Sequence, residues 1–403
     1  MKSIFKRLFL LGLVVMMSIE LVSCGEQKEK VDETVNETAA ETEAPSETTV
    51  LKDGTAEITF DGTKVRQGIV DFMRGMASVE WTPNESFSLN GDHNTWGVDL
   101  NFKKGKPYRG LPYTRAFSNL EDFAKYIEDG VYEGPCGSYD TMPGNNCSSS
   151  CDLAWREYLI SNTEATYTYV PGYGNKTITA VGSYQYPANN RDTLKIISEN
   201  PQDEIFEAYA LVKPADAIVK WSNKNSAGHA RMVCAEAVVM RNAQGKINGG
   251  RSYITVIEQT NKLTSADGRE TTWLVDKMYT FAQLMADGYV PVTPVALADG
   301  KTETPTVKLT DGNTSKNVVS SLMGNIETNT RVSEIELIVT DAQGAYVKSH
   351  KAEIENGMAK INLRKYTFNL DIGSLPSGKY KYKIMIHTPK LGSACLQELP
   401  FEK

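Results

Sequence analysis

The stretch GNNCSSSCDLAW, residues 144–155, leads from a turn into a predicted helix and brings a cysteine to the first turn of that helix. Small polar residues follow Cys147, and an apolar stripe at helical spacing begins at Leu153. Unpaired backbone N–H groups and the helix dipole stabilise a thiolate at this position. The sequence therefore predicts that Cys147 is a nucleophile. The alternatives are Cys151, which lies one helical turn later, and a buried or disulfide-bonded Cys147 without a chemical role.

A cysteine nucleophile needs a base, and His229 is the histidine best placed to supply it. It lies at the start of a predicted apolar strand, next to Gly228, which leaves room for the imidazole. A purely structural histidine is the alternative. A third group would orient the imidazole, and the next predicted strand offers Glu258 and Gln259. Because neighbours on a strand point to opposite faces, only one of them can reach His229, and we favour Glu258.

The first residues have the pattern of an export signal. Lys2, Lys6 and Arg7 precede an apolar run over residues 8–19, which is too short to span a membrane. Residues 21–24 read LVSC and resemble a bacterial lipobox. The resemblance implies that residues 1–23 are removed and that Cys24 becomes a diacylated membrane anchor. A simple secretory signal is the alternative. In both cases we expect a protein of the cell envelope that faces away from the cytoplasm.

Residues 24–54 predict a disordered acidic tether. Eight acidic residues and two lysines lie between Gly25 and Val50, among Thr, Ala, Pro and Ser residues that cannot form a core. The tether carries most of the formal net charge of −7, so the folded remainder is only mildly acidic. A mildly acidic body argues against nucleic acid as a partner.

Apart from Cys24, the chain has an odd number of cysteines: Cys136, Cys147, Cys151, Cys234 and Cys395. An odd number in an exported protein leaves at least one thiol free or available for pairing with another chain. A disulfide between Cys136 and Cys151 is one candidate pairing, and it would leave Cys147 free. The cysteine spacings do not fit a four-cysteine zinc site and the chain has only four histidines, so we predict no metal and no cofactor.

The length of 403 residues allows two folded domains. Residues 55–298 mix predicted helices and strands in the order of an α+β fold. We expect helices at 64–76, 120–127, 201–210 and 277–287, and strands at 55–60, 217–221, 229–240 and 252–259. After a boundary near residues 299–305, residues 303–403 contain only predicted strands and turns, which favours an immunoglobulin-like β-sandwich.

Several short motifs in residues 56–298 resemble the NlpC/P60 and CHAP families of bacterial papain-like amidases. The segment from Asn146 to Ser149 is similar to their nucleophile segment Asp-Cys-Ser-Ser, and Gly228-His229 is similar to their Gly-His segment. Residues 214–216, Pro-Ala-Asp, resemble their Pro-Gly-Asp turn, and Tyr113 matches the tyrosine that precedes the nucleophile in many members. Asn146 in place of aspartate and Ala215 in place of glycine are departures from the pattern.

The resemblance implies a papain-like fold and a thiol hydrolase that cleaves peptide-like amide bonds. His229 would pair with the Cys147 thiolate, Glu258 or Gln259 would fix the imidazole, and Tyr113 would lie near the oxyanion. The expected substrate is the peptide stem of the cell wall. The alternative is a non-enzymatic surface module that binds glycan or protein. A third reading is acyl transfer of the transglutaminase type, which uses similar residue types.

Overall fold

The structure is a computed structural model that describes residues 48–52, 54–90, 98–160, 169–173, 177–300, 305–355, 357–366 and 370–403. The export signal, Cys24 and most of the tether lie outside the described residues, so those expectations remain predictions. Two hydrophobic cores organise the described residues. We call the part around the first core, residues 65–300, the α+β region. The part around the second core, residues 48–60 and 305–403, is the all-β region.

The helices of the α+β region are α1 (Val65–Ser78), α2 (Leu120–Ala124), α3 (Cys147–Arg156), α4 (Thr193–Ser198), α5 (Gln202–Ala210), α6 (Phe281–Ala286) and the 3-10 helix η2 (Val295–Gly300). Its strands are β3 (Glu80–Pro83), β4 (Phe87–Asn90), β5 (Asp99–Phe102), β6 (Tyr108–Arg109), β7 (Ile127–Glu128), β8 (Val131–Tyr132), β9 (Ile178–Ala180), β10 (Ala217–Ser222), β11 (Ala227–Val233), β12 (Tyr253–Ala266), β13 (Arg269–Thr280) and β14 (Val290–Pro294). The chain is therefore α+β, as predicted.

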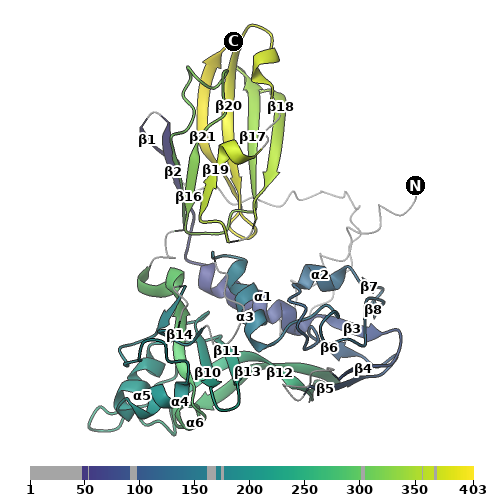
Figure 1. The fold of residues 1–403 in the computed structure, drawn as a ribbon, viewed down its shortest axis with the longest axis vertical. Helices are drawn as coiled ribbons and strands as arrows, with labels where there is room; N and C mark the ends of the chain where they lie inside the picture. Colours follow the sequence, from purple (N-terminus) through teal and green to yellow (C-terminus); the bar gives the residue numbers. More distant parts are fainter. Residues whose placement is uncertain are drawn as a thin grey trace, which may run out of the picture. The chain divides into compact units, whose positions relative to one another are not determined.

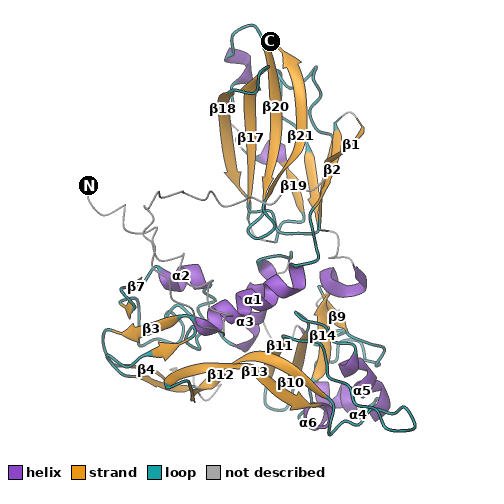
Figure 2. Ribbon diagram, turned by 180° about the vertical axis from the view of Figure 1, so that it is seen from behind, coloured by secondary structure: helices purple, strands orange, loops and turns teal. Residues whose placement is uncertain are grey.

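One large sheet forms the base of the α+β region. In the described part of the chain it holds ten strands in the order β7-β8-β3-β6-β13-β12-β11-β10-β14-β9. Neighbours pair antiparallel, except that β6 pairs parallel with β13 and β3 parallel with β8. Figure 2 shows β12 and β13 as one long curved pair of strands. Strands β4 and β5 form a separate two-stranded sheet.

Two helices cover the part of the sheet that carries the candidate site. Helix α1 buries one apolar face, which includes Ile69, Met73 and Met76 at helical spacing. Helix α3 is buried along almost its whole length, from Cys147 to Trp155. It packs against β11 and β12, and α1 packs against α3 (Figure 1). The helix that carries Cys147 thus packs against both the large sheet and α1.

The all-β region consists of two antiparallel sheets that share the second core. The first sheet has the order β1-β2-β15-β16-β19 and the second has the order β18-β17-β20-β21. Their bounds are β1 (Thr48–Lys52), β2 (Thr55–Thr59), β15 (Thr306–Thr310), β16 (Asn325–Thr328), β17 (Glu334–Asp341), β18 (Tyr346–Glu353), β19 (Lys360–Asn362), β20 (Lys379–His387) and β21 (Ser393–Glu402), with short 3-10 helices at Leu363–Lys365 and Ile372–Ser374. Side chains from both sheets, such as Leu309 and Ile384, are fully buried.

The structure corrects the predicted start of the first domain. Strand β2 was expected in the α+β part, but it pairs with β15, and its Ala56 and Ile58 belong to the second core. Strand β1 lies within the predicted tether and pairs with β2. The alternating pattern of residues 55–60 predicts a strand correctly, but the pattern contains no information about which distant strand it joins.

Two predicted elements also have different bounds. Residues 277–280 end strand β13 instead of starting a helix, because Thr280 is the N-cap of α6 and forms a capping box with Gln283. Strand β11 ends at Val233, not Met240. The β12–β13 hairpin was missed. Its turn is Asp267-Gly268, and both residues have positive φ, the sequence signal of a tight two-residue hairpin turn.

Candidate active site

Cys147 occupies the first position of helix α3, and Asn146 caps that helix. The Asn146 side chain accepts hydrogen bonds from the backbone N–H groups of Ser148 (3.1 Å) and Ser149 (3.0 Å). In return, Ser149 Oγ accepts from the Asn146 N–H at 2.7 Å, which completes a capping box. Asn146 therefore caps helix α3 with its side-chain oxygen, as an aspartate at this position would. The N–H of Cys147 itself has no acceptor inside the helix, because helix geometry leaves the first N–H groups unpaired.

The Cys147 thiol is enclosed by groups that can donate hydrogen bonds. The hydroxyl of Tyr113 lies 4.0 Å from Cys147 Sγ and can donate to it. The backbone N–H of Ala230, on β11, also donates to the sulfur. Only 5% of Cys147 is exposed. A buried sulfur that receives several donors is suited to carry negative charge.

His229 connects Cys147 to a buried carboxylate. Its Nε2 lies 2.5 Å from Oε2 of Glu258, a residue that is only 1% exposed. The imidazole also forms a hydrogen bond with Cys147. Because Nε2 is taken by Glu258, the nitrogen that faces the sulfur is Nδ1. The three side chains therefore form a chain in the order thiol, imidazole, carboxylate, as predicted for the residue types.

Charge within this chain shifts each pKa in the direction that favours an ion pair. Burial alone would raise the pKa of Cys147, but the positive charge and hydrogen bond of His229 outweigh it and lower this pKa to about 7. Burial alone would lower the pKa of His229, but the Cys147 thiolate and Glu258 raise it to about 9. Between these values the site holds a thiolate beside an imidazolium.

The structure distinguishes between the two candidates for the third group. Glu258 lies on the same sheet face as His229, whereas Gln259 points to the opposite face, as strand alternation requires. Gln259 Nε2 donates to the carbonyl oxygen of Leu111 at 2.8 Å. Gln259 therefore anchors the segment that leads to Tyr113 and does not contact the imidazole.

Sequence reasoning missed two residues that contact Glu258. Arg231 Nε donates to Glu258 Oε2 at 2.8 Å, and the Tyr279 hydroxyl donates to Oε1 at 2.5 Å. Arg231 lies two residues after His229 on β11, so alternation already places both on one face. Tyr279 lies in the β13 segment that was predicted to be helical, which is why its role could not be anticipated.

The other cysteines are placed differently from Cys147. Cys151 is fully buried, and burial together with the nearby Cys147 raises its pKa well above the ordinary value. Cys136 and Cys151 are both free thiols, so the candidate disulfide between them is not formed. The Cys136 thiol lies 2.9 Å from Glu85 Oε1. Of the two candidate nucleophiles, only Cys147 has a base beside it.

The Pro-Ala-Asp turn at residues 214–216 packs against helix α3. The Ala215 carbonyl accepts a hydrogen bond from Trp155 Nε1 at 2.8 Å, and Asp216 pairs with Arg66 at 2.8 Å. Ala215 has φ +71°, in the left-handed region that favours glycine. The turn therefore keeps the backbone that glycine would adopt, although alanine occupies the position.

Ala215→Gly is expected to change the free energy of unfolding by less than about 0.5 kcal/mol. Relief of left-handed strain, about 1–2 kcal/mol for a non-glycine residue, is offset by the lost buried methyl and by greater entropy of the unfolded chain. Ala208→Gly lies inside helix α5 and relieves no left-handed strain. It should therefore lower the free energy of unfolding by about 1 kcal/mol or more. Urea unfolding of both variants checks this. Equal losses at the two positions would contradict the strain argument.

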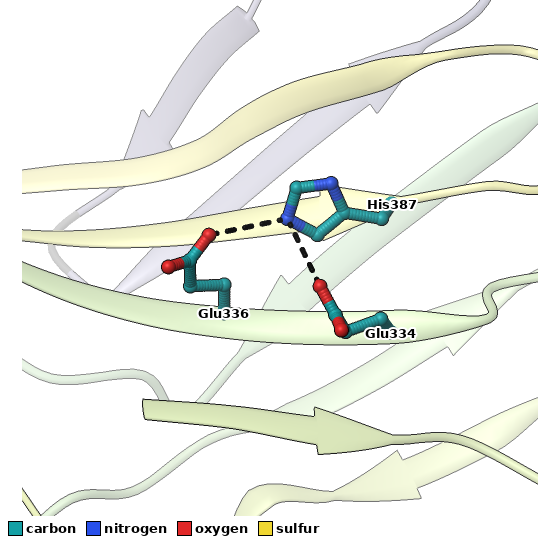
Figure 3. A group of neighbouring side chains, drawn as sticks. All are labelled: Glu334, Glu336 and His387. Carbon is teal, nitrogen blue, oxygen red and sulfur yellow. Dashed lines mark ion pairs between the residues drawn. The ribbon is translucent and has the colours of Figure 1, made fainter. Parts of the chain in front are cut away.

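In the described part of the chain, one group of side chains has the residue types and proximity of metal ligands: Glu334, Glu336 and His387, whose ligand atoms lie within 4.8 Å of one another. Figure 3 shows both carboxylates directed at His387. Their oxygens lie 3.7 Å (Glu334) and 3.6 Å (Glu336) from His387 Nε2. Lys351 Nζ lies 2.9 Å from Glu334 and 3.8 Å from Glu336. Because the Lys351 ammonium group already pairs with both carboxylates, we describe the group as an ion-pair cluster of the all-β region and assign it no metal.

No protein-family model, curated protein or solved structure matches this chain. Among the described helices, none has the length and apolar character needed to cross a membrane.

Proposed function

We propose that this protein is a thiol hydrolase that cleaves peptide-like amide bonds, with Cys147 as nucleophile and His229 as general base and acid. The observation that carries the proposal is the hydrogen-bonded chain from Cys147 through His229 to Glu258. It joins residues from a helix N-terminus and two strands, far apart in sequence, in the order that activates a cysteine nucleophile.

In the proposed reaction the Cys147 thiolate attacks the amide carbonyl carbon. The developing oxyanion accepts hydrogen bonds from the Cys147 N–H and from the Tyr113 hydroxyl. Burial keeps the pKa of Tyr113 well above its ordinary value, so the hydroxyl stays protonated and able to donate. Imidazolium His229 then gives its proton to the leaving amine, and a thioester remains on Cys147. His229 next removes a proton from water, and the resulting hydroxide releases the carboxylic acid and restores the thiolate.

For fold and biological setting, we propose a papain-like domain of the NlpC/P60 or CHAP type, followed by an immunoglobulin-like sandwich. The motif resemblance around Cys147, His229 and Tyr113 supports the first part, and the two antiparallel sheets of the all-β region support the second. Together with the lipobox-like segment before Cys24, this makes the peptide stem of the cell wall the proposed substrate and the lipid-anchored envelope the proposed location.

One observation favours the alternative of a non-enzymatic binding module. Cys147 is only 5% exposed, so a substrate must gain access to the sulfur before it can be attacked. In a retained but inactive scaffold the thiol could stay enclosed. Hydrolysis of wall peptides by the purified protein separates the two functions, because a binding module would retain the peptides without cleaving them.

The proposed mechanism predicts a bell-shaped pH dependence of kcat/KM on a wall-peptide substrate. Activity should rise as Cys147 loses its proton near pH 7 and fall as His229 loses its proton near pH 9. The two limbs belong to the coupled pair and not to single residues. Initial rates from pH 5 to pH 10 measure the profile. Activity that still increases up to pH 10 would contradict a role for protonated His229.

A further inference from the structure

We propose that Arg231 and Tyr279 are positioning residues that lock the Glu258 carboxylate and, through it, aim the imidazole of His229 at Cys147. This inference rests on the proposed function and adds a second layer to its site. Neither residue contacts the sulfur in the interactions described above. Their effect would act entirely through Glu258.

The carboxylate of Glu258 forms hydrogen bonds with three side chains on the two neighbouring strands. Oε2 is shared by His229 Nε2 at 2.5 Å and Arg231 Nε at 2.8 Å, and Oε1 receives the Tyr279 hydroxyl at 2.5 Å. Two of these donors come from β11 and one comes from β13, on either side of β12. A carboxylate fixed at both oxygens cannot rotate about its terminal torsion, so its bond to His229 keeps one direction.

Arg231 is itself held in place by aromatic rings. Its guanidinium carbon lies 3.8 Å from the ring centroid of Tyr279 and 4.1 Å from that of Tyr289. Its side chain is only 9% exposed. The Tyr289 ring also meets the imidazole of His229 edge-on, with centroids 6.4 Å apart. Stacking of this kind fixes the plane of a guanidinium group and favours Arg over Lys at the position.

Arg231 also places a permanent positive charge beside Glu258. Glu258 is buried, and a buried carboxylate without a permanent cation tends to take up a proton. His229 cannot serve as that cation throughout the reaction, because it gives up its proton during each cycle. Arg231 remains charged at every step and so keeps Glu258 ionised. Other charged groups also lie near this cluster. Lys220 lies opposite His229 on β10 and over the Tyr289 ring, and Lys277 lies over the Tyr279 ring. The charge of Asp287 acts on both Lys220 and Tyr279.

The test is the pH dependence of Cys147 alkylation by iodoacetamide, followed by peptide mass spectrometry, in Tyr279→Phe. Loss of the hydroxyl should weaken the Glu258–His229 bond and raise the apparent pKa of Cys147 by about half a unit to one unit. Alkylation at pH 6 should then slow about three- to tenfold. Tyr184→Phe is the matched control, because it removes a buried hydroxyl that donates to the Pro291 carbonyl, away from Glu258.

Variants at position 231 test the charge. Arg231→Met should raise the apparent pKa of Cys147 more than Tyr279→Phe does. Arg231→Lys should reverse part of that rise, because it restores the charge without the Nε hydrogen bond.

Thermal melting identifies any variant that does not fold. If Tyr279→Phe matches Tyr184→Phe and the unchanged protein, the inference is wrong while the proposed function stands. If the unchanged protein has no lowered Cys147 pKa, the proposed function itself fails.

Discussion

Cys147→Ser is expected to lower kcat/KM on a wall-peptide substrate by about a thousandfold or more. A serine hydroxyl has a far higher pKa than a thiol, so the pair with His229 would stay neutral and attack would lose its anionic nucleophile. The helix N-terminus and the Ala230 N–H stabilise a thiolate, but they cannot by themselves ionise an alcohol. Hydrolysis is measured as the release of new amino groups.

Cys151→Ser is the matched control for this experiment. It changes a cysteine of the same helix, one turn later, whose sulfur is fully buried and whose pKa is raised well above the ordinary value by burial. A serine there can donate back to the helix carbonyl one turn earlier, so the helix should persist. We expect activity within about a factor of three of the unchanged protein. Loss of activity in Cys151→Ser but not in Cys147→Ser would move the nucleophile.

His229→Ala is expected to slow the alkylation of Cys147 at pH 7 by about fiftyfold or more. In the intact site the pKa of Cys147 is lowered to about 7, so about half of the thiol is ionised at that pH. Without the imidazolium, burial acts unopposed and the pKa rises above its ordinary value, which leaves only about one per cent as thiolate.

His387→Ala is the control for histidine removal, because His387 belongs to the ion-pair cluster of the all-β region. Alkylation of Cys147 should be unaffected in that variant. If His229→Ala reacts as fast as the unchanged protein, the thiolate does not depend on the imidazole, and the ion pair is not the source of its reactivity.

The candidate site could be predicted from sequence because its signals are local. The cap and apolar stripe around Cys147 place it at a helix N-terminus, and strand alternation places Glu258 and Gln259 on opposite faces. The choice of Glu258 was then correct as a contact of His229. The resemblance to papain-like families added only the expectation that these residues act together in one site.

The partners of distant strands could not be predicted in the same way. Residues 55–60 show the alternation of a strand, yet nothing local indicates that β2 joins β15 about 250 residues later. The contact of Tyr279 with Glu258 depends on the β12–β13 hairpin. Its turn signal, Asp267-Gly268, was present in the sequence but lay inside a segment without clear strand alternation.

The most direct test of the central claim is the pH profile of alkylation at each cysteine of the unchanged protein, read by peptide mass spectrometry. We predict that Cys147 reacts with a midpoint near pH 7, while Cys151 does not react until the protein unfolds. A Cys147 midpoint at or above its ordinary value of 9.0, or no reaction of Cys147 at all, would contradict the thiolate–imidazolium pair and the hydrolase built on it.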